Sequence, residues 1–211
     1  MRVRITFKKG EAMRFIGHLD LYRTWERIFR RAGLPLAYSQ GFKPHPRINL
    51  ASALPLGFTG SNEILEFWLE NDLPLHDIEQ RINKALPSGL EIVHIKQISL
   101  EESSLQSTVA ASEYTITLLE SIPELYKRIN EILEAKILLC NRRGKQYDLR
   151  PLVIELLHSS CENDTHQEIK VILKTEEKAT GRPEELVALL GGHPEHARIR
   201  RDRIIFKEPT K

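Results

Sequence analysis

Apolar and polar residues alternate at the start of the chain, and this alternation then gives way to a helical period. The stretch RVRITF at 2–7 alternates as a half-buried strand does. In HLDLYRTWERIFRRA at 18–32, apolar side chains recur at steps of three and four, which predicts a helix with one buried stripe. The stripe is made of Leu21, Tyr22, Trp25, Ile28, Phe29 and Ala32. Gly33 and Pro35 predict the end of this helix.

The remainder of the first half continues with two strands and a second helix. We expect extended chain with an internal loop over 37–60, strands at 63–70 and 90–98, and a helix at 75–86. The resulting order is βαββαβ. Two split βαβ units in this order predict a ferredoxin-like sandwich, in which one antiparallel sheet carries both helices on one face.

The same order of elements recurs after a polar stretch. SLEESSLQSTVAAS at 99–112 is rich in serine and has no period, so we interpret it as a linker. Beyond it we expect strands at 113–120, 151–160, 167–175 and 197–206 and helices at 122–135 and 182–190. We also expect a hairpin over 136–149 that turns at Arg143-Gly144. The sequence therefore predicts an α+β protein of two tandem ferredoxin-like (βαββαβ) domains, at 1–98 and 113–211.

Charge is distributed unevenly along a chain of 211 residues whose net charge is only +2. Residues 1–50 hold 11 Lys and Arg against three Asp and Glu, whereas residues 51–102 hold three against nine. A basic end of this kind indicates an anionic partner, either nucleic acid or an acidic protein surface. A charged surface that only keeps the protein soluble is the alternative.

The sequence favours a cytoplasmic protein. No apolar run approaches the roughly 18 residues needed to span a bilayer, and the first residues lack the apolar core of a signal peptide. We expect Cys140 and Cys161 to be free thiols, with no disulfide and no metal, because disulfides need an oxidising compartment.

Basic residues gather on the first helix, on the face opposite its apolar stripe. Arg23, Arg27, Arg30 and Arg31 lie within one arc of the circumference. Like charges at this spacing repel each other by a few tenths of a kcal/mol per pair, so the arrangement favours an anionic partner. The alternative is a solvated face whose arginine stems cover the edge of the core.

A second set of basic residues lies in AYSQGFKPHPR at 37–47. Pro44 and Pro46 stiffen the chain, so Lys43, His45 and Arg47 should line one side of it. Gly41 permits a sharp turn or a close approach to a ligand. We expect this loop and the arginine face to form one anion-binding surface. In the alternative interpretation, Tyr38 and Phe42 are core residues and the prolines mark an edge-strand bulge.

The chain has no strong catalytic signature. It contains no Gly-rich phosphate loop, no HExxH and no pair of cysteines with zinc spacing. His193 and His196 could hold a metal, but GGHPEH is more typical of a polar turn. His18 with Asp20 could act as an acid–base pair or simply cap the helix. His18 and His45 are thus only weak catalytic candidates, and we expect neither a metal nor a cofactor.

Two stretches resemble a bacterial family known for its association with radical-SAM proteins. FIGHLDLYRTWERIFRRAGLPLAYSQGFKPHPRINLASALPLG, which ends at Gly57, resembles the defining block, and DLRP at 148–151 resembles a weaker second signature. The matching positions include His18, Asp20, Arg27, Arg30, Arg31, Pro35, Tyr38, Ser39, Gly41, Phe42, Pro44, Pro46, Gly57, Asp148 and Arg150. The resemblance implies an accessory or substrate-presenting domain, fused to or encoded beside a B12-binding radical-SAM protein. It supplies no catalytic residues.

Three functional hypotheses follow. The leading one is a non-catalytic binding module that docks a radical-SAM partner, presents RNA to it, or both. The second is a metal-independent ribonuclease that uses His18 or His45 as acid or base; a distant similarity of arrangement to tandem ferredoxin-like CRISPR RNA-processing proteins points the same way. The third is a pure protein–protein adaptor with a basic face. We expect no membrane association.

Overall fold

The protein is a mixed α/β protein with mostly antiparallel strands. Its computed structural model describes residues 1–142, 144–160, 166–175 and 180–208, which contain four α-helices and ten strands. The chain divides into two compact units, which we call the N-terminal unit (Met1–Val109) and the C-terminal unit (Ala110–Glu208). Each unit is described by itself.

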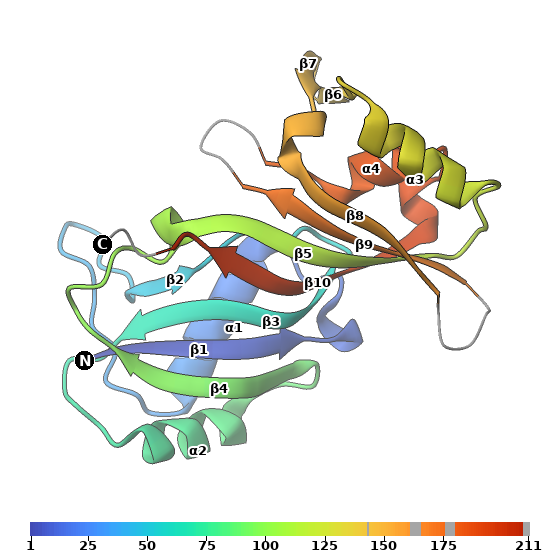
Figure 1. Cartoon of the computed structure of the whole chain (residues 1–211). Helices are drawn as coiled ribbons and strands as arrows, with labels where there is room; N and C mark the ends of the chain where they lie inside the picture. The colour runs from blue at the N-terminus through green and yellow to red at the C-terminus, as the bar shows by residue number, and fades with distance from the viewer. Residues whose placement is uncertain (143, 161–165, 176–179, 209–211) are drawn as a thin grey trace. The chain divides into compact units, whose positions relative to one another are not determined.

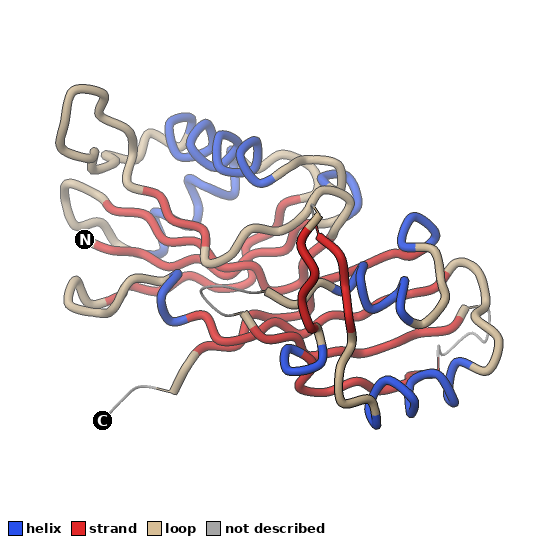
Figure 2. The backbone as a smooth tube through the Cα atoms, turned by 90° about the horizontal axis from the view of Figure 1, so that it is seen from above, coloured by secondary structure: helices blue, strands red, loops and turns tan. Residues whose placement is uncertain are grey.

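The N-terminal unit follows the expected order of elements. Its strands and helices are β1 (Arg2–Lys9), α1 (His18–Arg31), β2 (Ile48–Leu50), β3 (Thr59–Trp68), α2 (Leu75–Ala85) and β4 (Leu90–Ile98), with short 3-10 helices at Glu11–Met13 and Gln106–Thr108. Strands β4, β1 and β3 are neighbours in that order, and β2 pairs with β3. All of these pairs are antiparallel. Figures 1 and 2 show α1 and α2 on one side of this sheet.

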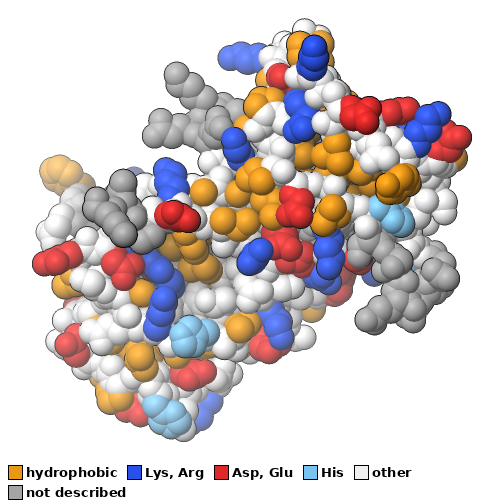
Figure 3. All heavy atoms as spheres, viewed as in Figure 1, with side chains coloured by type: hydrophobic (Ala, Val, Ile, Leu, Met, Phe, Trp, Pro, Cys, Tyr) orange, Lys and Arg blue, Asp and Glu red, His pale blue; other side chains and the backbone are white. Residues whose placement is uncertain are grey.

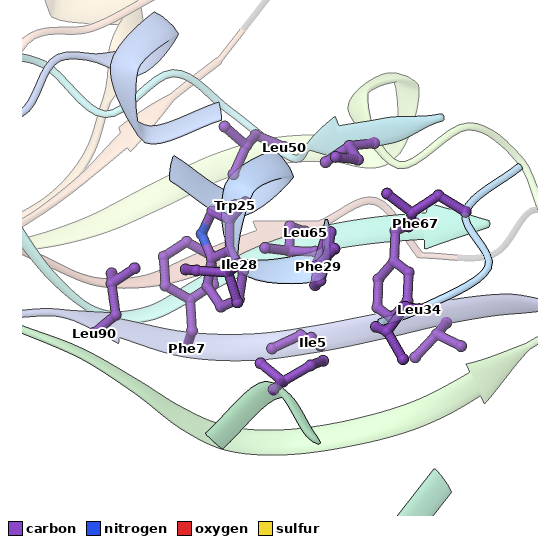
Figure 4. Packing of buried hydrophobic residues seen from close by; sticks show 14 of the residues in the cluster. Ile5, Phe7, Trp25, Ile28, Phe29, Leu34, Leu50, Leu65, Phe67 and Leu90 are labelled. Carbon is purple, nitrogen blue, oxygen red and sulfur yellow. The ribbon is translucent and has the colours of Figure 1, made fainter. Parts of the chain in front are cut away.

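The core of this unit lies between its helices and one face of the sheet. The phase predicted for α1 is confirmed, because Trp25, Ile28 and Phe29 are buried while Arg23, Arg27 and Arg30 are exposed. Figure 4 shows the aromatic side chains packed together. The ring centroids of Trp25 and Phe7 are 4.9 Å apart, and those of Phe29 and Phe67 are 4.3 Å apart. The contacts join α1 to both central strands.

Side chains on β1, β2 and β3 alternate between the two faces of the sheet. Those that face the helices are buried in the core, namely Val3, Ile5, Phe7, Ile48, Leu50, Leu65 and Phe67. Arg2, Asn49, Glu66 and Trp68 occupy the intervening positions, so they lie on the face away from α1 and α2, which we call the second face. Figure 3, drawn from the same side as Figure 1, shows basic side chains beside acidic ones over the strands of this unit.

The C-terminal unit repeats the order with one addition. Its elements are β5 (Val109–Leu118), α3 (Leu125–Glu134), β6 (Leu139–Arg142), β7 (Lys145–Asp148), β8 (Val153–Ser160), β9 (Gln167–Lys174), α4 (Pro183–Leu189) and β10 (Ala197–Phe206), with 3-10 helices at Arg150–Leu152 and Pro194–His196. Strands β10, β5, β9 and β8 are neighbours in that order. Strands β6 and β7 pair as a separate hairpin, at the place where the sequence predicted one. These connections do not confirm the predicted tandem ferredoxin-like arrangement.

Residues 99–112, which we expected to be a linker, include the start of a strand and several buried side chains. Strand β5 begins at Val109, inside 99–112, and Val109 and Ala111 are buried. Leu105 is also fully buried, and the Gln106 side chain donates a hydrogen bond to the Leu50 carbonyl at 3.1 Å. The short apolar residues in this stretch therefore pack, although they show no strand or helix period in the sequence.

Candidate nucleic-acid interface

The loop at 37–47, which we call the hairpin loop, folds back on itself as two short antiparallel arms. The Arg47 N–H donates to the Ala37 carbonyl at 2.8 Å, and the Ser39 N–H donates to the His45 carbonyl at 2.9 Å. Between these two pairs, Tyr38 and Pro46 face each other in an isolated antiparallel bridge. A proline fits there because residues opposite each other in an antiparallel pair alternate between bonded and unbonded positions. The prolines stiffen a projecting loop.

Ser39 and His45 hold the two arms together through their side chains. Ser39 Oγ accepts the His45 backbone N–H at 3.2 Å and lies 3.0 Å from His45 Nδ1. The serine hydroxyl can therefore donate its own hydrogen to Nδ1. A neutral ring would then carry its proton on Nε2, which leaves an N–H donor for a ligand.

The hairpin loop presents two aromatic side chains to solvent, Phe42 at its tip and Tyr38 on one of its arms. Phe42 is fully exposed, at 109%, and Tyr38 is 41% exposed. The alternative interpretation, in which both are core residues, is therefore wrong. Gly41 precedes the tip with φ of +132°, a conformation that glycine adopts without strain. Lys43, next to Phe42, is exposed as well.

One contact ties the hairpin loop to α1. The Tyr22 hydroxyl donates to the Pro46 carbonyl at 3.0 Å. Burial, with Glu26 nearby, raises the pKa of the Tyr22 phenol, so the hydroxyl keeps its hydrogen at neutral pH. The base of the loop is thus held against the helix, while its tip projects.

A pocket opens on the second face beside the base of the hairpin loop. Its volume is about 360 Å³, and we call it the Trp68 pocket. The Arg47 guanidinium lies 4.6 Å from the Trp68 ring centroid, and the Arg2 guanidinium lies 5.3 Å from it. The residues that line the pocket are Arg2, His45, Pro46, Arg47, Ile48, Asn49, Trp68, Leu100, Glu102 and Ser104. Aromatic, basic, amide and carboxylate groups therefore meet in one hollow.

Residues 99–104, which we call the strap, form one wall of this pocket and are held by Arg2. The Arg2 guanidinium donates to the carbonyls of Ser99, Glu102 and Ser103 at 3.3, 2.6 and 2.9 Å. It also binds the fully buried carboxylate of Glu66 at 2.7 Å. Five donors in a planar fork allow arginine to join a strand to a distant segment in this way.

The arginines of α1 do not join this surface. Arg23 pairs with Asp20 at 3.4 Å and Arg30 pairs with Glu26 at 2.7 Å. Arg27, opposite the buried stripe, points away from the sheet, whereas Arg47 lies over Trp68 on the second face. The structure therefore places the helix arginines and Arg47 on opposite sides of the sheet, not on the single surface that we expected.

Arg31 belongs to a separate pocket. It lies at the end of α1 beside Arg81 and Lys84 from the last turns of α2, in a hollow of about 460 Å³. Ala32, Ala85, Leu86 and Pro87 form its apolar wall. Cations are favoured at helix C-termini by the helix dipole, so this cluster has a structural reason of its own.

The segment that ends at Gly57 is held by hydrogen bonds to Arg14, which lies just before α1 in the chain. The Gly57 N–H donates to the Arg14 carbonyl at 3.0 Å, and Arg14 Nε donates to the Gly57 carbonyl at 2.8 Å. Gly57 has φ of +86°, which favours glycine. The buried Lys9 ammonium donates to the Phe58 and Arg14 carbonyls at 2.8 and 3.2 Å. His18, half-buried, begins α1 just after this anchor.

The second signature has a structural role in the C-terminal unit. Asp148 Oδ1 accepts the Leu138 N–H at 2.7 Å and the Arg150 N–H at 2.9 Å. The Arg150 guanidinium donates to the carbonyls of Leu133 and Val153 at 3.0 and 3.2 Å. Asp148 and Arg150 thus join α3, the β6–β7 hairpin and β8.

A polar cluster ties the β6–β7 hairpin to α4. Arg142 binds the Glu185 carboxylate at 2.8 and 2.9 Å, and the Tyr147 hydroxyl donates to the same carboxylate. Burial and the hydrogen bond to Glu185 raise the pKa of the Tyr147 phenol, and burial raises the pKa of the Cys140 thiol. A neutral phenol and a protonated, buried thiol are poor nucleophiles. Cys161 lies outside the described residues.

The remaining histidines give no sign of a metal centre. His193 and His196 lie with ring centroids 5.6 Å apart, and His196 Nδ1 is 2.9 Å from Glu120. Within the described ranges, no group of three or more His, Cys, Asp and Glu side chains is arranged to hold a metal ion.

The described helices include none that is long and apolar enough to cross a membrane. A cytoplasmic location stays a prediction.

The sequence interpretation missed several residues of the Trp68 pocket. Trp68 could have been placed, because Leu65 and Phe67 point into the core and a strand alternates. Asn49 follows by the same argument from Ile48 and Leu50. Arg2 and Glu102 could not have been placed, since they meet across 100 residues of sequence.

Comparison with known proteins gives a family and no activity. A family model described as an uncharacterized protein conserved in bacteria (DUF2344) matches residues 2–183. No curated protein matches the chain. The family description contains no reference to radical-SAM proteins, so that association stays an expectation from the resemblance.

Proposed function

Because the chain belongs to this bacterial family, whose description assigns no activity, we propose a function from its own surface: a non-catalytic module that binds single-stranded RNA. The single observation that carries the proposal is the hairpin loop. It presents a fully exposed Phe42 beside Lys43, next to the pocket in which Arg47 lies over Trp68.

An exposed Phe42 contributes nothing to the core, since burying such a side chain is worth about 1.5–3 kcal/mol and this one is not buried. At a nucleic-acid surface the same ring offers a face for stacking. Stacking a base on an aromatic side chain contributes about 1–3 kcal/mol. Exposed aromatic rings interleaved with basic side chains are typical of proteins that bind single strands.

The basic residues of the hairpin loop suit the phosphate backbone. Lys43 and Arg47 are exposed, and neither makes an ion pair within the described residues. If Lys43 contacts a phosphate, the logarithm of the affinity should fall with the logarithm of the salt concentration. The slope should be about 0.7 per contact for a single strand.

The order of elements supports the same proposal. Both units follow βαββαβ, and in each the fourth strand lies beside the first, which lies beside the third, which lies beside the second. We propose that both are ferredoxin-like, the C-terminal unit with the β6–β7 hairpin inserted. Domains with this order include RNA-recognition modules that bind bases on the sheet face away from the helices. The Trp68 pocket opens on that face.

A second candidate function, the protein–protein adaptor, is favoured by a separate observation. Phe15 and Leu56, exposed at 74% and 63%, each adjoin one member of the hydrogen-bonded pair Arg14 and Gly57, and Leu19 in the first turn of α1 is exposed at 70%. Exposed apolar side chains gathered in this way are typical of protein-binding surfaces. A radical-SAM protein, the partner that the resemblance implies, could dock there while RNA occupies the hairpin loop.

RNA binding can be tested by fluorescence anisotropy with a labelled oligouridylate. Phe42→Ala should weaken binding by about 5- to 150-fold, the equivalent of one lost stacking contact. Phe15→Ala is the matched control, because it removes another exposed phenylalanine of the same unit, and it should leave the affinity unchanged. Equal affinities for the wild type and Phe42→Ala would contradict the proposal.

The same assay separates the alternatives. If RNA is cleaved in the presence of a chelator and His45→Ala abolishes cleavage but not binding, the protein is a ribonuclease. If RNA does not bind, while Phe15→Ala abolishes capture of a purified radical-SAM partner, the adaptor function is correct.

A further inference from the structure

Three polar side chains of the Trp68 pocket come from separate segments. Arg47 precedes β2, Asn49 lies on β2, and Glu102 lies on the strap. The Asn49 amide makes no hydrogen bond, and the Arg47 guanidinium no hydrogen bond or ion pair, with any described residue. The Glu102 carboxylate pairs with Arg4 at 3.3 Å and stays 48% exposed. Their hydrogen-bonding capacity is therefore open to a ligand.

The Arg47 guanidinium contacts the Trp68 ring, and its N–H groups make no hydrogen bond with any described residue. The central carbon of the guanidinium lies 4.6 Å from the ring centroid, within the range of a cation–π contact. All five N–H groups of the fork lie in its plane. Two of them can donate in parallel to a pair of adjacent acceptors on a ligand.

Glu102 is held in the wall of the pocket by its backbone. Its carbonyl accepts from Arg2 at 2.6 Å, and the next carbonyl, that of Ser103, accepts from Arg2 at 2.9 Å. A carboxylate at this position repels phosphate, so the pocket is not built for the RNA backbone alone. The two oxygens of a carboxylate accept hydrogen bonds from a pair of adjacent N–H donors.

A guanidinium edge and a carboxylate together select one base, and we infer that the Trp68 pocket recognises guanine. Guanine offers the adjacent acceptors O6 and N7, which arginine binds in a bidentate manner. It also offers adjacent donors at N1 and N2, which suit the Glu102 carboxylate. Adenine places an acceptor at N1, opposite a carboxylate, and uracil has only one N–H donor on its pairing edge.

This inference rests on the proposed function, since it names the base that the RNA-binding surface would select. A guanine base could also come from a free nucleotide. The chemistry recognised is the same, so the experiment needs separate arms for RNA and for the nucleotide.

The test uses the full chain and three labelled RNAs: an oligouridylate, the same RNA with one central guanosine, and the same RNA with one central adenosine. We expect the guanosine RNA to bind about tenfold more tightly than the adenosine RNA. Glu102→Gln should reduce this ratio toward one and leave the affinity for oligouridylate equal or higher, because a negative charge is lost. Glu101→Gln, the matched control, removes the neighbouring charge outside the pocket and should keep the ratio.

A second variant tests the other side of the base. Arg47→Lys keeps the charge but removes the planar fork, so it should lower the guanosine preference more than the affinity for oligouridylate. A preference that survives both Glu102→Gln and Arg47→Lys would overturn the assignment to this pocket.

The remaining outcomes separate the two proposals. Equal binding of all three RNAs would overturn guanine recognition and leave RNA binding intact. If no RNA binds, the proposed function fails, and calorimetry with GMP and AMP then decides the inference alone. A preference for GMP that Glu102→Gln removes would support the pocket as a nucleotide site, whereas no preference would overturn it.

Discussion

Replacing Arg2 with alanine should destabilise the N-terminal unit and release the strap. The substitution removes two hydrogen bonds to the Glu66 carboxylate, at 3.0 and 2.7 Å. It also removes the donors to three strap carbonyls.

The size of the effect follows from the burial of Glu66, which is 0% exposed. Removing one partner of a buried ion pair costs about 3–5 kcal/mol, because a charge is left without compensation. Arg4 still binds the same carboxylate, at 2.6 Å, and limits the loss. We therefore expect a decrease of about 3 kcal/mol in the free energy of unfolding.

Urea unfolding followed by tryptophan fluorescence measures this loss in the correct unit, because both tryptophans of the chain, Trp25 and Trp68, belong to the N-terminal unit. Lys8→Ala is the matched control on the same strand. Its exposed pair with Glu91 should contribute less than about 1 kcal/mol. If Arg2→Ala costs no more than Lys8→Ala, Arg2 does not hold the strap.

Three further predictions concern the core and the titrating groups. Trp25→Ala should lower the free energy of unfolding by about 3–5 kcal/mol in urea, as for other large core aromatics, and a loss below about 1 kcal/mol would contradict the packing. The pKa of the Tyr147 phenol is raised above its ordinary value of 10.0. The contribution of the phenol to stability is therefore complete below that pH and is lost as the pH rises further. Tyr147→Phe should remove this decrease in stability from unfolding curves measured at alkaline pH. The hydrogen bond that His196 donates to the Glu120 carboxylate raises the pKa of His196 above 6.5, so the contribution of this pair to stability is present below that pH and is lost at higher pH. An NMR titration should show a lower pKa for His196 in Glu120→Gln, and an unchanged value would refute the contact.

The elements were predictable where local periodicity determines the structure. The three-and-four spacing of α1 placed Trp25, Ile28 and Phe29 in the core, because a helix with one apolar stripe has only one way to bury it. The predicted strands at 90–98 and 197–206 coincide with β4 and β10. In such segments the local pattern of apolar and polar residues is enough to predict the element.

The candidate site was predictable only in part. The sequence indicated a projecting basic segment, but it left open whether Phe42 is buried or exposed, since an aromatic residue beside prolines is compatible with either. Helical phase placed four arginines on one arc, yet it could not say that Arg31 meets Arg81 and Lys84 while Arg47 crosses to the second face. These relations depend on which strands pair, and pairing over long separations has no local signature.

The strap also determines how far the N-terminal unit can be shortened at its C-terminal end without loss of structure. A shortened protein that ends at Ile98 would retain all four strands and both helices of the first half. It would lack the carbonyls that satisfy Arg2, the wall of the pocket that carries Glu102, and the buried Leu105. Truncation for expression or for crystallisation should therefore extend through Val109, and a fragment ending at Ile98 would misrepresent both the stability and the ligand preference of the unit.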